Sequence, residues 1–106
     1  MVTQFDVYLV DLEPTLGVEI RKKRPCLIVS PNEMNGLMRS VIIAPMTTKF
    51  RGFPTRIQCE LQDKTGFIVL DQIRAIDKVR LVKKLGSINV NTQTMVLNKL
   101  QEMFAV

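Results

Sequence analysis

Apolar and polar side chains alternate along several short segments of this chain, and a period of two residues is typical of β-strands. The clearest alternation spans residues 55–62, where polar side chains separate Ile57, Cys59 and Leu61. This segment should form a strand with one buried and one exposed face. Five further segments are rich in strand-forming residues and are also predicted to be strands: 5–12, 25–30, 39–46, 67–70 and 81–88.

Turn-forming residues separate the predicted strands. Residues 32–36 should form a turn or a short helix, and residues 63–66 should connect the fourth and fifth strands as a hairpin. Pro45 has no backbone N–H, so the third strand should end there or lie at a sheet edge. Residues 77–80 are predicted to form a single helical turn.

The C-terminal segment has the period of an α-helix. Asn91 is a favourable N-cap residue. The apolar side chains after it form one stripe that should bury either against the strands or against a second subunit: Val96, Leu100, Met103 and Phe104. The chain is therefore expected to be mainly β (α+β). It should form a twisted antiparallel barrel of five or six short strands with a C-terminal helix, in a single domain over residues 1–106.

The chain of 106 residues has 15 Lys and Arg, 10 Asp and Glu, and a formal net charge of +5. This excess favours an anionic partner such as RNA, DNA, an acidic protein or a membrane surface. An ordinary globular protein that is merely basic fits the charge equally well. No apolar segment approaches the roughly 20 residues that span a bilayer, and the N-terminus lacks the pattern of a signal peptide. We therefore expect no membrane association.

Cys26 and Cys59 each lie in an apolar segment, which predicts buried free thiols in a reduced, cytoplasmic protein. The sequence has no histidine, the commonest general base and the commonest zinc ligand. It also lacks glycine-rich phosphate loops, nucleophile elbows and clusters of metal-ligating residues. We therefore expect neither a metal nor a cofactor.

A basic run, residues 21–24, follows Glu19 and is the first candidate site. Neighbouring cations are stable in water and favourable beside phosphate, so a solvated loop and a phosphate-binding loop both fit. Arg24 differs from the rest because it directly precedes Pro25 and a predicted buried strand. Its backbone should be anchored while its guanidinium, a planar fork of donors, projects toward a phosphate oxygen.

Two further groups of polar residues follow predicted strands. Thr47, Thr48 and Lys49 come after the third strand, where hydroxyls can orient a phosphate, although turn formation is the simpler interpretation of a threonine pair. Asp71 and Gln72 come after the fifth strand. They can read base edges by hydrogen bonding, or the aspartate can pair with an arginine and stabilise the strand end. The residues alone support both roles.

Three blocks of residues occur in a specific order. Residues 6–25 contain Asp-x-x-Pro-x-x-Gly-x-Glu followed by Arg-Pro, residues 41–47 form an apolar strand that ends in threonine, and residues 70–77 contain Asp-Gln-x-Arg-x-x-Asp. An Arg-Leu-x-x-x-Leu-Gly segment follows at 80–86. Together with the C-terminal helix, these blocks resemble the MazF/PemK/Kid family of type II toxins over essentially the whole chain.

The resemblance implies an SH3-like barrel, a homodimer and an RNA groove formed by loops. It also implies an mRNA interferase, an endoribonuclease that needs no metal, cuts single-stranded RNA at short sequences and inhibits growth. In that chemistry the ribose 2′-hydroxyl attacks the adjacent phosphorus and gives a 2′,3′-cyclic phosphate and a 5′-hydroxyl. The expected inhibitor is an acidic antitoxin of the MazE/PemI kind, whose extended tail covers the groove.

At matching positions, Arg24 corresponds to the catalytic arginine of the family and Thr47 to the hydroxyl that holds the scissile phosphate. Glu19 and Asp71 match acidic positions that contact RNA bases or the reacting region. The remaining expected substrate contacts are Lys22, Thr48, Lys49 and Gln72.

The chain departs from the family at two places. Residues 20–23 are largely basic where many members have Gln-Gly-Gly, and Val18 and Val69 stand where Kid-like members have a histidine and an arginine. A mechanism that depends on those two side chains cannot operate here. This favours Arg24 with Thr47 and leaves the general base unassigned.

Two other functions fit parts of the sequence. A non-enzymatic toxin of the related CcdB type would bind a protein such as DNA gyrase, and the apolar end of the helix at 103–106 suits this role. A simple RNA-binding barrel would display stacking aromatic rings, for which Phe50 and Phe53 are the candidates. The polar residues that match the family favour RNA cleavage, because neither alternative needs that set.

Overall fold

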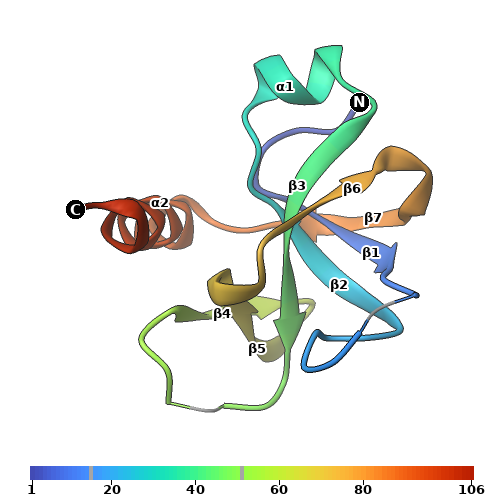
Figure 1. Cartoon of the computed structure of the whole chain (residues 1–106). Coiled ribbons are helices and arrows are strands. Elements are labelled where there is room, and N and C mark those ends of the chain that lie inside the picture. The colour runs from blue at the N-terminus through green and yellow to red at the C-terminus, as the bar shows by residue number, and fades with distance from the viewer. Residues whose placement is uncertain (15, 51) are drawn as a thin grey trace.

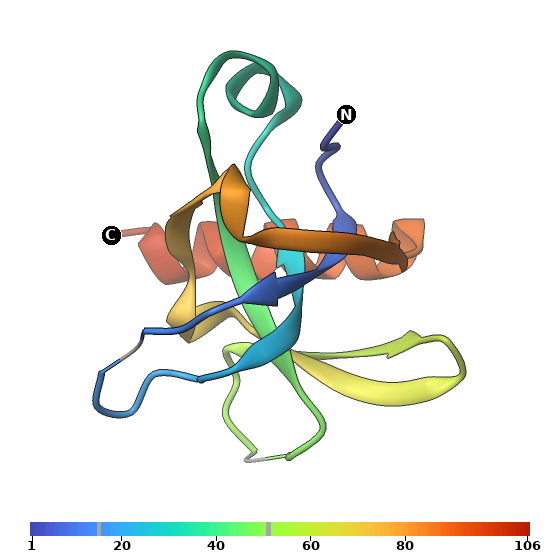
Figure 2. The ribbon, with the colours of Figure 1, turned by 90° about the vertical axis from the view of Figure 1, so that its right-hand side faces the viewer.

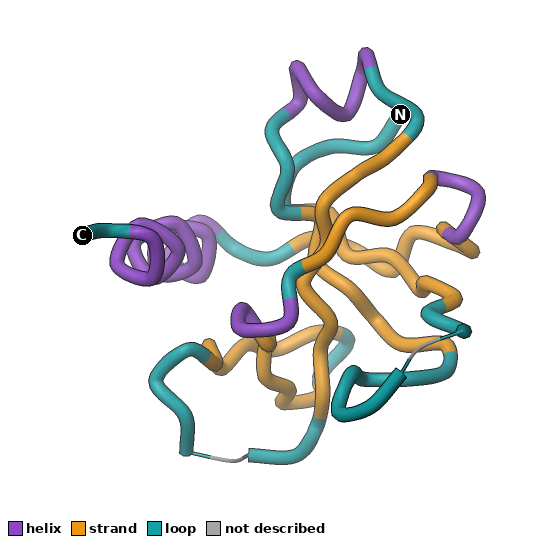
Figure 3. The backbone as a smooth tube through the Cα atoms, viewed as in Figure 1, coloured by secondary structure: helices purple, strands orange, loops and turns teal. Residues whose placement is uncertain are grey.

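The computed structural model describes residues 1–14, 16–50 and 52–106. Within these ranges the chain forms a curled antiparallel sheet, shaped as a half-barrel, and a C-terminal helix (Figure 1 and Figure 3). The predicted mainly β fold with a C-terminal helix is confirmed. The strands are β1 (Asp6–Asp11), β2 (Lys23–Ile28), β3 (Ser40–Thr47), β4 (Arg56–Leu61), β5 (Lys64–Val69), β6 (Arg74–Asp77) and β7 (Leu81–Ser87).

The strands follow the order β4-β5-β3-β2-β1-β7, and β6 pairs with β3 beside this path. The short strand β6 was not predicted, because four residues are too few to show a clear alternation. The helices are α1 (Asn32–Leu37) and α2 (Val90–Phe104), and two 3-10 turns, η1 (Leu70–Gln72) and η2 (Lys78–Arg80), flank β6. The expected short helix near 32–36 and helical turn near 77–80 are both present.

Strand β3 joins the two halves of the sheet, and Pro45 lies inside it rather than ending it. On one side β3 pairs with β2. On the other side it pairs with β6 up to Ile43 and with β5 from Met46 onward. Pro45 falls between these two registers, where its missing N–H costs no ladder hydrogen bond. The predicted strand end at Pro45 is therefore wrong.

Apolar side chains form two separate clusters, and successive residues of β2 belong to different clusters. Leu27 packs in the first cluster, whereas Cys26 and Ile28 pack in the second. Helix α2 covers the first cluster and contributes Val96 to it, and Figure 2 shows the helix running across that side of the strands. The central strands are therefore buried on both faces, which their continuous apolar segments require.

Helix α2 begins two residues earlier than predicted. Its N-cap is Asn89, whose side chain accepts a hydrogen bond from the backbone N–H of Thr92 at 2.8 Å, rather than Asn91. Leu100 and Met103 pack against the first cluster as expected. Phe104 does not belong to the buried stripe, because 71% of its surface is exposed.

The hairpin between β4 and β5 turns at Gln62 and Asp63, so of the predicted connection 63–66 only Asp63 lies in the turn. Both residues have positive φ, 52° and 63°, and Leu61 pairs directly with Lys64 across the turn. A two-residue turn with positive φ at both positions matches the right-handed twist of the strands.

Different segments of the chain form the two ends of the half-barrel. Helix α1 and the N-terminus lie at one end, and the β1–β2 and β3–β4 loops lie at the other (Figure 1). Among the described residues, no helix has both the length and the apolar character needed to cross a membrane. The loops at the second end contain four of the eight predicted site residues, and Arg24 and Thr47 lie near the strand ends beside them.

Candidate functional site

A cleft of about 430 Å³ opens between the β1–β2 loop, the β3–β4 loop and η1. Six of the eight predicted site residues line it, and the cleft brings them together from three separate parts of the chain. The lining residues are Val18, Ile20, Arg24, Thr47, Thr48, Lys49, Arg56, Asp71 and Gln72.

The register of β2 with β3 explains why Arg24 and Thr47 share the cleft. Cys26 pairs with Pro45 at the cleft end of this ladder, and Arg24 and Thr47 each lie two residues beyond that pair on the two neighbouring strands. Arg24 is itself held in β2 by its pairing with Val10 of β1. Two strands that are fixed by the buried sheet therefore set the relative position of this pair.

The Arg24 side chain is exposed, and its Nε–H donates to the backbone oxygen of Arg21 at 3.3 Å. This contact uses one donor of the guanidinium and leaves the other N–H groups for an anion. The side chain is thus restrained by its own loop while it faces solvent.

Thr47 is the last residue of β3 and pairs with Phe67 of β5. Its Oγ1 accepts a hydrogen bond from the backbone N–H of Lys49 at 3.2 Å, which sets the direction of the following loop. The Thr47 hydroxyl hydrogen is free to point into the cleft.

Arg24 and Thr47 also line a second, smaller cavity of about 210 Å³. The two residues and Thr48 are common to both cavities, so they form part of the wall between them. The smaller cavity is walled mainly by side chains from β3, β4, β5 and β7: Met46, Leu61, Lys64, Thr65 and Leu85, with Pro25 and Gln62 beside them.

Contacts to η1 and β6 hold the β1–β2 loop over the site. The Gln72 side-chain oxygen accepts a hydrogen bond from the backbone N–H of Ile20 at 2.9 Å. Glu19 pairs with Arg74 at 3.7 Å, and its other carboxylate oxygen accepts from the N–H of Leu16 at 3.2 Å. Glu19 lines a neighbouring cavity of about 290 Å³ with Gln72 and does not line the main cleft. Both polar groups therefore already have partners within the protein.

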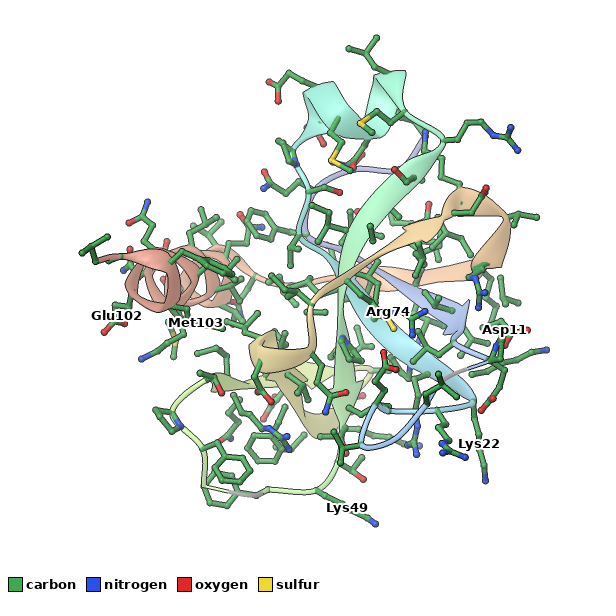
Figure 4. All side chains as sticks on the ribbon, in the orientation of Figure 1. Asp11, Lys22, Lys49, Arg74, Glu102 and Met103 are labelled. Atoms are coloured by element: carbon green, nitrogen blue, oxygen red, sulfur yellow. The ribbon has the colours of Figure 1, made fainter. Side chains whose placement is uncertain are left out.

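Lys22 is the predicted site residue that lies farthest from this arrangement. It lines none of the three cavities, and its backbone N–H donates to the Glu13 carboxylate at 2.9 Å. Figure 4 shows its side chain extending outward from the same end of the molecule as that of Lys49. Both lysines therefore add positive charge to this end, but only Lys49 borders the cleft.

Asp71 pairs with an arginine, as one of its two predicted roles required. Its Oδ1 accepts a hydrogen bond from the Thr55 hydroxyl at 2.9 Å and lies 3.5 Å from Nε of Arg56. Sequence reasoning did not select Arg56, because the alternation in residues 55–62 puts it on the exposed face. The signal that could have found it is its place at the start of β4, directly after the basic loop.

The charge of the cleft is positive. Arg24, Lys49 and Arg56 face one carboxylate, that of Asp71, among its lining residues. Cys26 lies two residues after Arg24, but burial raises the pKa of its thiol to about 12, against a smaller opposing effect of the positive charge on Arg74. This buried thiol is therefore protonated at neutral pH and is not a candidate nucleophile.

Cysteine, aspartate and glutamate side chains are the residues of this chain that most readily bind metal ions. In residues 1–14, 16–50 and 52–106, no three of these side chains come together in a group that could hold a metal ion. The polar groups that line the cleft are guanidinium, ammonium, hydroxyl and amide groups and the carboxylate of Asp71.

Comparison with known proteins gives the family. Residues 3–104 match the model of the PemK-like, MazF-like toxins of type II toxin–antitoxin systems. Among solved structures, MazF from Deinococcus radiodurans superposes with a TM-score of 0.87 at 21% identity, over 99% of this chain and 97% of that one. A mycobacterial endoribonuclease in complex with its cognate antitoxin gives a TM-score of 0.82 at 27% identity, over 96% and 93% of the two chains. Since the family model covers nearly the entire sequence, this chain belongs to the PemK-like, MazF-like toxin family of type II toxin–antitoxin systems.

Proposed function

We propose that this toxin is an endoribonuclease that cuts single-stranded RNA at short sequences without a metal ion. The observation that supports this most strongly is the cationic cleft, whose lining includes both Arg24 and Thr47. The net charge of +5 suits a polyanionic substrate. The mycobacterial protein that this chain resembles is itself described as an endoribonuclease.

In the proposed reaction the RNA supplies its own nucleophile. The 2′-oxygen attacks the adjacent phosphorus and loses its proton, the bond from phosphorus to the 5′-oxygen breaks, and that oxygen leaves with a proton as a 5′-hydroxyl. The other product is a 2′,3′-cyclic phosphate. Arg24 stabilises the additional negative charge on the phosphorane oxygens, and the Thr47 hydroxyl holds the phosphate in place.

The other polar residues of the cleft bind the substrate in this proposal. Lys49 and Thr48 contact the RNA backbone at the start of the β3–β4 loop. Gln72 in the cleft and Glu19 in the neighbouring cavity fix the β1–β2 loop beside the bound strand, and the Gln72 amide N–H groups can contact a base edge. Lys22 acts at longer range, through its charge alone.

We further propose that the toxin acts in the cytoplasm as a homodimer and is inhibited by an acidic antitoxin. Solved relatives include a MazE–MazF complex from Deinococcus radiodurans and the mycobacterial complex with a cognate antitoxin. An acidic extended segment would complement the positive cleft and exclude RNA from it.

The deciding experiment is incubation of the purified protein with a long single-stranded RNA in excess EDTA, followed by mapping of the fragment ends. We expect discrete cuts that share a short sequence and leave 5′-hydroxyl ends. Arg24→Ala should lower the cleavage rate by at least about 100-fold, because transition-state charge stabilisation is lost. Arg39→Ala is the matched control, since Arg39 is 93% exposed near α1 at the opposite end. Equal rates for wild type and Arg24→Ala would refute the assigned mechanism.

One observation favours a second candidate, a toxin that acts by binding a protein. Phe104 at the end of α2 is largely exposed, and such an aromatic side chain at a helix end is a suitable contact for a protein target. The same EDTA assay separates the candidates. Intact RNA together with inhibition of DNA gyrase supercoiling would favour protein binding.

A further inference from the structure

Arg56 is an unusual charged residue in the cleft. Its side chain is only 11% exposed, and its Nε atom is fully buried. Among the described residues, this Nε–H has no hydrogen-bond partner. Because Nε itself is buried, an anion in the cleft would bind the terminal N–H groups of the guanidinium rather than Nε.

The neighbours of Arg56 hold its guanidinium in place without using up its donors. The Phe53 ring centre lies 5.1 Å from Cζ, and the Arg56 backbone N–H donates to the Phe53 carbonyl at 3.1 Å. The Asp71 carboxylate lies 3.5 Å from Nε, an ion pair without a hydrogen bond. A guanidinium has five N–H donors. Arg56 is therefore restrained by stacking and charge while its capacity to bind an anion remains.

The position of Arg56 separates it from the Arg24–Thr47 pair. Arg56 begins β4 and pairs with Val69, so β5 lies between it and β3. It nevertheless lines the same cleft as Arg24, Thr47 and Lys49. The volume of about 430 Å³ is in the range of sites that hold a nucleotide-sized ligand.

We propose that Arg56, together with Lys49, forms a second phosphate-binding subsite, which holds an RNA phosphate next to the scissile one at Arg24 and Thr47. This inference rests on the proposed ribonuclease function. Arg56 is a positioning residue in it: it fixes the register of the strand in the cleft and takes no part in the bond changes. Asp71 and Phe53 preorganise the guanidinium, which lowers the cost of ordering it when RNA binds.

Binding of an uncleavable RNA tests the subsite independently of catalysis. The probe is a short RNA that contains the mapped cleavage sequence, with a 2′-O-methyl group on the ribose that would attack. Arg56→Gln should weaken its binding on the order of 10-fold, because a charge-assisted phosphate contact is lost. The slope of log K against log salt should become shallower by about 0.7, the value for one phosphate on a single strand.

A control variant and a rescue variant distinguish a phosphate contact of Arg56 from a purely structural role of this residue. Arg39→Gln also removes one positive charge, from the opposite end of the molecule, and should leave affinity and slope nearly unchanged. Arg56→Lys should keep the salt slope of the wild type and recover part of the affinity, since it retains the charge but loses the planar fork. Circular dichroism and thermal melts confirm that each variant is folded.

Neutral methylphosphonate linkages give a test that leaves the protein unaltered. At one linkage next to the scissile phosphate, the substitution should weaken wild-type binding on the order of 10-fold and have little further effect in Arg56→Gln. At other linkages it should affect both proteins equally. Additive effects at every linkage, or unchanged binding by Arg56→Gln, would overturn the subsite.

The two proposals fail in different ways. If the wild type cuts RNA in EDTA but shows no coupling between Arg56 and any linkage, the subsite is wrong and the ribonuclease assignment stands. If the wild type cuts no RNA at all, the ribonuclease assignment fails and the subsite fails with it.

Discussion

Burial determines the protonation of a side chain beside the cleft as much as nearby charge does. Cys26 lies in the second apolar cluster, next to a strand that ends in a cationic cleft. Burial removes solvent from the thiolate form and so raises the pKa of the thiol from an ordinary value of 9.0 to about 12. The folded protein therefore keeps a proton on this sulfur under conditions in which the unfolded chain loses it.

This difference predicts a loss of stability in alkali. The contribution of the protonated thiol is complete below about pH 9, and it falls as the pH rises toward 12 because only the unfolded state ionises. Near pH 10 the loss should be about 1 kcal/mol. Urea unfolding of wild type and Cys26→Ala, near pH 7 and near pH 10, measures it. The drop between the two pH values should be larger in the wild type, and equal drops would contradict the assignment.

The cleft residues show what local reasoning can and cannot predict. Arg24 could be selected because the proline after it and the apolar strand beyond fix its backbone. Arg56 could not, because an alternating strand usually exposes its polar face. The stacking of Phe53 from the preceding loop covers this arginine, and a contact between loop and strand leaves no periodic signal. Lys22 was selected for its charge, but the bond of its N–H to Glu13 keeps it outside the cavities.

The hydrophobic periodicity of the sequence predicted nearly every helix and strand. It did not predict where helix α2 begins or where strand β3 ends, because these positions depend on contacts with other elements. Asn89 and Asn91 are equally good N-cap residues in isolation. Helix α2 uses the first, because it begins directly after Ile88 has been buried in the first cluster. In the same way Pro45 stays within β3 because two partner strands change over at that point.

The two asparagines form a matched pair for a stability test. Asn89→Ala should lower the free energy of unfolding by about 1 kcal/mol, because the N–H of Thr92 loses its acceptor. Asn91→Ala should change it by less than about 0.5 kcal/mol, since Asn91 is exposed in the first turn and alanine favours helix. Chemical denaturation of the two variants measures both values. A larger loss for Asn91→Ala would place the helix start at the residue expected from sequence.

The complete chain concentrates its functional charge at one end. The net charge of +5 gave only a preference for an anionic partner. The fold shows where an anionic partner could bind, because β2, β3, β4 and η1 all contribute polar residues to one cleft. The sequence order of the family blocks predicted which residues would meet there. It could not predict the shape of the cleft, which depends on how two loops lie across a curled sheet.

This arrangement predicts a definite salt dependence for RNA binding. If Arg24 neutralises the scissile phosphate and Arg56 with Lys49 neutralises the next one, log K for the uncleavable RNA should fall against log salt with a slope of about −1.4. Fluorescence anisotropy across a range of salt concentrations gives this slope. A slope near zero would mean that the cleft does not contact the RNA backbone.

Finally, the link between the β4–β5 hairpin and the rest of the sheet has a consequence for engineering. This hairpin is paired to the remaining strands through Met46 and Thr47 of β3, whereas Arg24 is held by β1. The segment with Phe53 and Arg56 and the strand with Arg24 are thus separate parts that meet at Thr47. We therefore expect that residues 48–69 can be exchanged as one segment between relatives. The exchange should change the preferred RNA sequence and leave the proposed cleavage residues, Arg24 and Thr47, in place.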